Sequence, residues 1–142
     1  MSRDLKGVYM KRLLLTFVLL WPAILLAELR AGMDAFNGGD YAAAHREWLP
    51  VAEQGNHLIQ TMLGVMYFNG WGVPRDEAGA VNWFRRAAEQ RNAFAQHSLG
   101  VVYSNGWGVP RNDLEAAKWF RLAAEQGHAD AQTFLGASSE SA

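Results

Sequence analysis

The side chains that most often carry out chemistry are few in this chain, and their spacing does not suit it. The 142 residues include no cysteine, so neither a thiolate nucleophile nor a cysteine-based metal site is available. The four histidines never form the His-x-x-x-His pair that presents two metal ligands on one helix face. They are His45, His57, His97 and His128. The sequence therefore predicts no metal site.

Serine-based hydrolysis and phosphate binding are equally unsupported by the motifs. The signatures Ser-x-x-Lys and Gly-x-Ser-x-Gly are absent, and Ser98 and Ser104 have no base close to them in sequence. Gly70 and Gly72 follow an expected helix and serve a turn, so they do not form a phosphate-binding loop. We predict no catalytic residue and no cofactor, and we expect that the protein is not an enzyme.

The elements that position these side chains begin with a segment unlike the rest. Lys11 and Arg12 precede an apolar run over residues 13–26, which ends at Ala27. This is the layout of a secretory signal peptide. The run is shorter than the roughly 20 apolar residues of a membrane-spanning helix. Residues 1–27 are therefore predicted to be a signal peptide cleaved after Ala27, which gives a periplasmic or secreted protein without a stable membrane span.

Two alternatives remain open for this segment: retention as an uncleaved signal anchor, and a true start at Met10 instead of Met1. Cleavage removes four basic residues and one acidic residue from the totals of 13 and 14, which leaves a net charge of −4. An acidic chain of this kind does not favour nucleic acid. Without cysteine no disulfide can form, so packing alone must stabilise the exported fold.

The rest of the chain is a single unit repeated with a period of 36 residues. Residues 56–91 and 92–127 are identical at 21 of 36 positions. Such a period predicts stacked structural repeats. The predicted segments are a first degenerate hairpin at 28–55, full repeats at 56–91 and 92–127, a half-repeat cap at 128–137 and a polar tail at 138–142.

Each unit has the pattern of two helices joined by a turn. In the first half, Ile59, Leu63 and Met66 fall on one helical face, and Ala80, Phe84 and Ala87 do so in the second half. The link Asn-Gly-Trp-Gly-Val-Pro-Arg contains two glycines and a proline, which end the first helix. We predict an all-α fold, an α/α solenoid of about 3.5 helical hairpins.

Several repeated residues are interpreted as parts of the architecture. Glycine inside a helix costs up to about 1 kcal/mol relative to alanine, so its recurrence at one register indicates close helix approach. We expect the two repeated tryptophans of the second helices to fill the seams between hairpins. The structural set is Leu63, Gly64, Tyr67, Trp83, Leu99, Gly100, Tyr103 and Trp119.

Two residues depart from the regular pattern. Pro50 lies within the expected second helix of the first hairpin and is predicted to kink or shorten it. Arg91 stands where the neighbouring units have Gly55 and Gly127. If that position is a left-handed helix C-cap, an arginine there is strained.

These residues resemble the Sel1-like repeat, a relative of the tetratricopeptide repeat. The family pattern runs Ala-x-Ala-Gln-x-x-Leu-Gly-x-x-Tyr, Gly-x-Gly-Val and Trp-Tyr-x-x-Ala-Ala-Glu-Gln-Gly. The third unit follows it at Ala93, Ala95, Gln96, Leu99, Gly100, Tyr103, Gly106, Gly108, Val109, Ala116, Trp119, Phe120, Ala123, Ala124, Glu125, Gln126 and Gly127. The resemblance implies an α-solenoid adaptor whose concave face, formed mainly by first helices, holds an unknown protein or peptide.

A different class of function also follows from the resemblance. Some relatives of the family are linked to β-lactam hydrolysis, so the alternative is a small cell-envelope hydrolase or a cell-wall binding protein. The sequence also leaves open a homo-oligomer formed through the terminal half-repeat.

The predicted partner-binding residues lie on the first helices, off the main apolar stripe, and in the link. They are Thr61, Val65, Phe68, Asn69, Trp71, His97, Val101, Ser104, Asn105 and Trp107. For the two tryptophans the alternative is that each indole folds over its neighbour and extends the core. For the helix positions the alternative is burial against the next hairpin.

Overall fold

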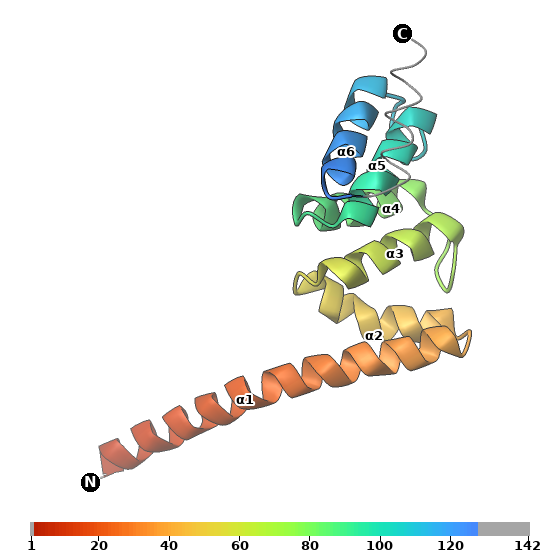
Figure 1. Ribbon diagram of the computed structural model, residues 1–142. Coiled ribbons are helices and arrows are strands. Elements are labelled where there is room, and N and C mark those ends of the chain that lie inside the picture. Colours follow the sequence, from red (N-terminus) through yellow and green to blue (C-terminus); the bar gives the residue numbers. More distant parts are fainter. Residues whose placement is uncertain (1, 128–142) are drawn as a thin grey trace.

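The structure, a computed structural model, describes residues 2–127, with the side chains of 2–5 and 13–19 left aside, and this part contains six helices and no strand (Figure 1). The helices are α1 Ser2–Asn37, α2 Tyr41–Glu53, α3 His57–Asn69, α4 Glu77–Glu89, α5 Ala93–Asn105 and α6 Asp113–Glu125. The predicted all-α solenoid of hairpins is confirmed. The predicted half-repeat cap at 128–137 and polar tail at 138–142 lie outside the described residues.

The helices form three hairpins stacked in chain order. Helices α1 and α2, α3 and α4, and α5 and α6 pack as pairs, while α2 contacts α3 and α4 contacts α5. Figure 1 shows these pairs as a column from which the N-terminal part of α1 projects well beyond its neighbours. The column therefore presents the first helices α3 and α5 as neighbours on one surface.

Local sequence signals begin and end the helices. The side chain of Asn56 accepts hydrogen bonds from the backbone N–H groups of Leu58 and Ile59, and Asp76 caps α4 in the same way. At the other end, Gly70 adopts a left-handed conformation with φ 71°, and its N–H bonds to the carbonyl of Met66. The same caps recur 36 residues later, which explains why α3–α6 all have 13 residues.

The helical glycines seat aromatic rings of the second helix. A Cβ at Gly64 would lie 2.5 Å from Cε1 of Phe84, and a Cβ at Gly100 would lie 2.6 Å from Cδ1 of Phe120. Both rings are buried. The expectation of close helix approach at these glycines is therefore confirmed.

The seam tryptophans are less buried than the sequence predicted. Trp83 and Trp119 pack against the core of the preceding hairpin but stay half-buried. The guanidinium of Arg86 lies over the Trp83 ring, 4.5 Å from its centre. The fully buried ring in each hairpin is instead the adjacent phenylalanine, because that position faces the helical glycine.

The first hairpin uses the same device at a shifted spacing. Gly32 lies in α1 against the indole of Trp48, which is fully buried and donates a hydrogen bond to the carbonyl of Leu29. Gly32 precedes Gly64 by 32 residues and not by 36, because only three residues link α1 to α2. The shortened link hides this glycine from a search at the repeat period.

Two further expectations for the first hairpin need comment. Pro50 does not shorten α2, which has 13 residues like its counterparts; the proline side chain is exposed. Helix α1 continues without a break across Ala27 and Glu28, and Leu25 and Leu29 both pack against the core of the first hairpin. No helix within the described residues is long and apolar enough to cross a membrane.

The exceptional conformation expected at Arg91 is confirmed. Arg91 has φ 67° and is the one non-glycine residue with a positive φ in the described part of the chain. The equivalent Gly55 and Gly127 have φ 104° and 83°. A side chain in this region costs roughly 1–2 kcal/mol per residue. The junction between the second and third hairpins therefore carries backbone strain.

The glycine–ring contact gives a first prediction. Gly64→Ala lowers the free energy of unfolding by about 1–3 kcal/mol, because the new methyl group overlaps the Phe84 ring and the gain in helix propensity does not compensate. Urea denaturation followed by circular dichroism measures the change. Phe84→Leu makes room for the methyl group, so it costs less in the Gly64→Ala background than alone. Equal or greater stability of Gly64→Ala would contradict the packing argument.

The strained junction gives a second prediction with a matched pair of variants. Arg91→Gly raises the free energy of unfolding by about 1 kcal/mol, because glycine adopts the positive φ without steric cost. Gly55→Ala lowers it by a similar amount; no atom lies within 4 Å of the added Cβ, so the backbone alone causes the loss. The same denaturation measurement tests both. Shifts of equal sign would contradict this assignment.

Candidate functional site

A groove lies between α3 and α5 on the surface formed by first helices. Its volume is about 360 Å³. The residues that line it are Val65, Phe68, Asn69, Phe84, Phe94, His97, Ser98, Val101, Val102 and Trp107. Six of the ten predicted partner-binding residues are among them: Val65, Phe68, Asn69, His97, Val101 and Trp107. The helix-face alternative, burial against the next hairpin, holds in part: Val65 and Phe68 pack against the α4/α5 core and Val101 against the core of α6, yet all three stay half-buried and line the groove.

The floor of the groove is apolar and comes from three helices. Phe84 of α4 and Val102 of α5 are buried beneath it, and the half-buried Val65 and Val101 form its sides. Phe94 stands at the edge with 51% of its surface exposed. Apolar surface that faces solvent in this way is characteristic of interaction sites.

Phe94 was missed by the sequence reasoning. It occupies the second position of α5, where α3 has Leu58, and both side chains are large, apolar and exposed. The signal was present in the sequence, because two large apolar residues occur at one register outside the core stripe. Hydrophobic periodicity alone does not identify Phe94, because the residue lies outside the core stripe at the start of its helix.

In the second and third hairpins, the charged side chains lie on the second helices and in the links. Helices α3 and α5 contain no Asp, Glu, Lys or Arg. Helices α4 and α6 carry several of each sign, for example Glu77 and Arg86 in α4. Helices α3 and α5 thus contribute no carboxylate, lysine or arginine to the groove, but Arg75 of the link places its guanidinium 5.7 Å from the ring centre of Phe68, which lines the groove.

The remaining predicted residues on the first helices lie outside the groove. Thr61 is only 7% exposed, and its hydroxyl donates a hydrogen bond to the carbonyl of His57, so a partner cannot reach it. Ser104 and Asn105 both bond to the carbonyl of Val101 and lie beyond the end of the groove. The prediction placed Thr61 on the wrong side of α3 because a helical stripe has no marked edge in sequence.

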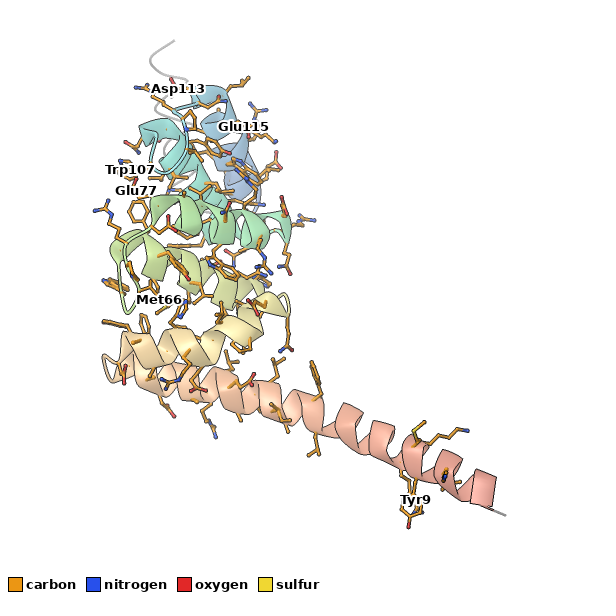
Figure 2. The ribbon with its side chains drawn as sticks, turned by 180° about the vertical axis from the view of Figure 1, so that it is seen from behind. Tyr9, Met66, Glu77, Trp107, Asp113 and Glu115 are labelled. Carbon is orange, nitrogen blue, oxygen red and sulfur yellow. The ribbon has the colours of Figure 1, made fainter. Side chains whose placement is uncertain are left out.

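The two link tryptophans have different surroundings. The Trp71 ring stacks on Tyr41 of the first hairpin, with centroids 5.4 Å apart and an interplanar angle of 19°. Glu77 begins α4 as Tyr41 begins α2, so it occupies the equivalent position beside the link of Trp107; Figure 2 shows these two residues near each other. The Trp107 ring approaches Phe68, with centroids 5.5 Å apart. Both indoles keep more than a third of their surface exposed. Trp71 therefore extends the core as the alternative proposed, whereas Trp107 also lines the groove.

Buried glutamines fix the spacing of the hairpins that form the groove. The Gln60 side chain donates to the carbonyl of Ala52 at 2.9 Å and accepts from Nε2 of Gln90 at 2.8 Å. One period later, Gln96 donates to Ala88 and accepts from Gln126 at 2.7 Å. Each glutamine thus joins three helices of two hairpins, and its bond to the backbone carbonyl is shielded from water, where hydrogen bonds matter most.

Tyrosines on the first helices reach back to the preceding hairpin. The Tyr67 hydroxyl lies 3.1 Å from Nε2 of His45, and the Tyr103 hydroxyl accepts from Arg85 at 2.7 Å. Burial lowers the pKa of His45 below its ordinary value of 6.5, so the ring is neutral at pH 7. These contacts explain why tyrosine recurs at this register although its ring is only half-buried.

The polar groups in the groove are arranged for structure more than for chemistry. The Ser98 hydroxyl donates to the carbonyl of Phe94 at 2.9 Å, so its proton is directed to the helix backbone. The His97 ring meets Phe120 edge-on at 5.4 Å. Within residues 2–127 no three side chains of His, Asp or Glu gather as they would around a metal ion.

Comparison with protein families and solved structures shows which known proteins share this architecture. The Sel1 repeat family model matches residues 60–92 and 93–128. A crystal structure of a protective antigen from uropathogenic Escherichia coli, described as having an SLR fold, superposes with a TM-score of 0.77 at 38% identity. A Sel1 repeat protein from Oxalobacter formigenes superposes with a TM-score of 0.71 at 37% identity.

These matches cover 82% and 74% of this chain but only 26% and 43% of the two solved chains, so the chain spans less than half of either relative. A search of curated proteins finds no match. The two family matches together run over residues 60–128, and the hairpins superpose on Sel1 repeat structures. The chain therefore belongs to the Sel1 repeat family.

Proposed function

We propose that this chain is an exported, non-catalytic interaction module that holds a segment of a partner protein in the groove between α3 and α5. Sel1 repeat proteins are generally protein-interaction scaffolds, which gives the coarse class of function. The observation that carries the proposal is the apolar groove whose edge exposes Phe94 and Trp107. Burying about 100 Å² of apolar surface contributes roughly 2.5 kcal/mol, so a few side chains suffice for a specific contact.

Export is proposed from the apolar N-terminal segment and its exposure. Leu20, Trp21, Ile24 and Leu26 are each about half exposed or more, and they lie on one helix next to the apolar run at 13–19. A helix with so much uncovered apolar surface is unfavourable in water. Cleavage after Ala27 removes most of that surface, and the hairpin from Glu28 onward keeps Gly32 with Trp48.

Photocrosslinking in cells tests the groove. A benzoylphenylalanine at position 94 replaces one exposed aromatic ring by another and is expected to attach a partner covalently. The same group at Leu114, which is 82% exposed on α6, serves as the matched control and should give little product. Val101→Asp should reduce crosslinking at position 94 at least tenfold, because an unpaired carboxylate in the groove must be desolvated. Equal crosslinking at both positions would refute the groove as the binding surface.

Mass spectrometry of the exported chain tests the processing. Expression with its own N-terminal segment in a Gram-negative host is expected to yield a periplasmic chain that begins at Glu28. Ala27→Tyr blocks a small-residue cleavage site and should retain the full segment. A soluble cytoplasmic chain that still begins at Met1 or Met10 would contradict export.

A further inference from the structure

A second pocket lies in the seam between α4 and α6, near the C-terminal ends of these second helices. Its volume is about 320 Å³, at the lower end of the range of roughly 300–1,000 Å³ in which ligand sites fall. It shares no lining residue with the groove between α3 and α5. Its lining includes Glu89, Arg91, Gln96, Trp119, Leu122 and Glu125.

The pocket combines an indole with two carboxylates. Trp119 and Leu122 are its large apolar residues, and both are half-buried. Glu89 and Glu125 are exposed, and neither forms an ion pair with another side chain of residues 2–127. Arg91 also lines the pocket, but two carboxylates against one guanidinium leave an excess of negative charge. An aromatic ring beside excess negative charge attracts a cation.

The second hairpin has an equivalent arrangement that already contains a cation. One period earlier, the sequence has the same indole and the same two carboxylates: Trp83, Glu53 and Glu89. There the guanidinium of Arg86 lies over the Trp83 ring, 4.5 Å from its centre. One period after Arg86 the sequence has Leu122. The third hairpin therefore keeps the indole and the carboxylates but lacks the arginine.

The neighbouring lysine does not replace the missing arginine. Nζ of Lys118 is 5.4 Å from the centre of the Trp119 ring and 3.8 Å from Oε1 of Glu115, and Lys118 does not line the pocket. In the part of the chain that the structure describes, no guanidinium lies over Trp119. The pocket is therefore open to a guanidinium from another molecule.

We infer that the pocket between α4 and α6 binds the guanidinium group of an arginine side chain from a protein partner, as Arg86 covers Trp83 within the second hairpin. A planar guanidinium stacks on an indole, and its N–H groups form charge-assisted hydrogen bonds with carboxylates. A lysine ammonium lacks the planar shape. The inference goes beyond the proposed function, since it concerns a second surface of the molecule.

The apolar part of the pocket favours a side chain over a free cation. An arginine buries its alkyl stem along apolar surface while its head remains polar. Leu122 and the edge of Trp119 offer such a surface next to the carboxylates. A small guanidinium ion has no stem to cover them, so it gains the electrostatic contacts alone.

Titration with arginine derivatives tests the site in the purified chain. N-acetylarginine methylamide is expected to produce a saturable shift of the Trp119 indole N–H signal in proton–nitrogen correlation spectra, and Trp119→Phe identifies that signal. The citrulline analogue has nearly the same shape without the charge, and it should bind about tenfold more weakly. Methylguanidinium lacks the stem and should bind about threefold more weakly.

Exchanging residues between the two hairpins provides matched variants. Leu122→Arg supplies the missing internal cation and is expected to abolish the saturable shift at Trp119. Arg86→Leu opens the equivalent site, so the indole signal of Trp83 should then respond to the arginine derivative as well. Circular dichroism checks that both variants remain helical. If Leu122→Arg does not fold, Arg86→Leu and the citrulline comparison still decide the question.

A carboxylate pair completes the test. Glu125→Gln should weaken binding about three- to tenfold through loss of a charged partner, whereas Glu53→Gln in the second hairpin leaves it unchanged. Equal affinity for the arginine and citrulline derivatives, or an unchanged titration in Leu122→Arg, would overturn the inference. Binding of methylguanidinium as tight as that of the arginine derivative would overturn the assignment to a protein side chain. Crosslinking at position 94 reports on the groove separately, so the proposed function stands or falls independently.

Discussion

The fold depends on a missing methyl group at one register of each first helix. Gly64 and Gly100 allow the rings of Phe84 and Phe120 to lie directly against the helix backbone, and Gly32 does the same for Trp48. These contacts set how closely the two helices of each hairpin approach. Since the chain has no cysteine, no covalent link shares this task. Each hairpin is therefore stabilised by an aromatic ring that fits between the two helices only because the residue facing it is glycine.

Hairpin stacking adds polar contacts to the apolar cores that neighbouring hairpins share. Gln60 and Gln96 bond to a backbone carbonyl of one hairpin and to a glutamine of their own. Directional bonds of this kind fix rotation as well as distance, which apolar packing alone does poorly. The spacing of α3 and α5, and with it the groove, follows from this repeated clamp. The charged residues of these hairpins lie on the second helices and in the links, so α3 and α5 themselves contribute no carboxylate, lysine or arginine to the groove.

The period, the hairpins and the strained Arg91 could all be predicted, because each follows from local residue types repeated at fixed spacing. The groove was predicted in part: Val65, Phe68 and Val101 line it as expected, but Thr61 is buried and Phe94 was missed. Sequence periodicity identifies a helix face without stating which neighbour covers its edges. Gly32 was not predicted, because the link after α1 is four residues shorter and shifts the glycine out of the 36-residue register. Trp83 was expected to fill the seam, but the ring that packs against Gly64 is that of Phe84.

The strain at Arg91 affects the junction at which the second and third hairpins can separate. The junction it occupies joins the second hairpin to the third, and the groove spans that junction, since α3 lies on one side and α5 on the other. In a solenoid each interface opens with its own free energy, so the weakest one defines where the array divides. Binding of a partner across α3 and α5 would connect the two hairpins on either side of this strained junction and so oppose its opening.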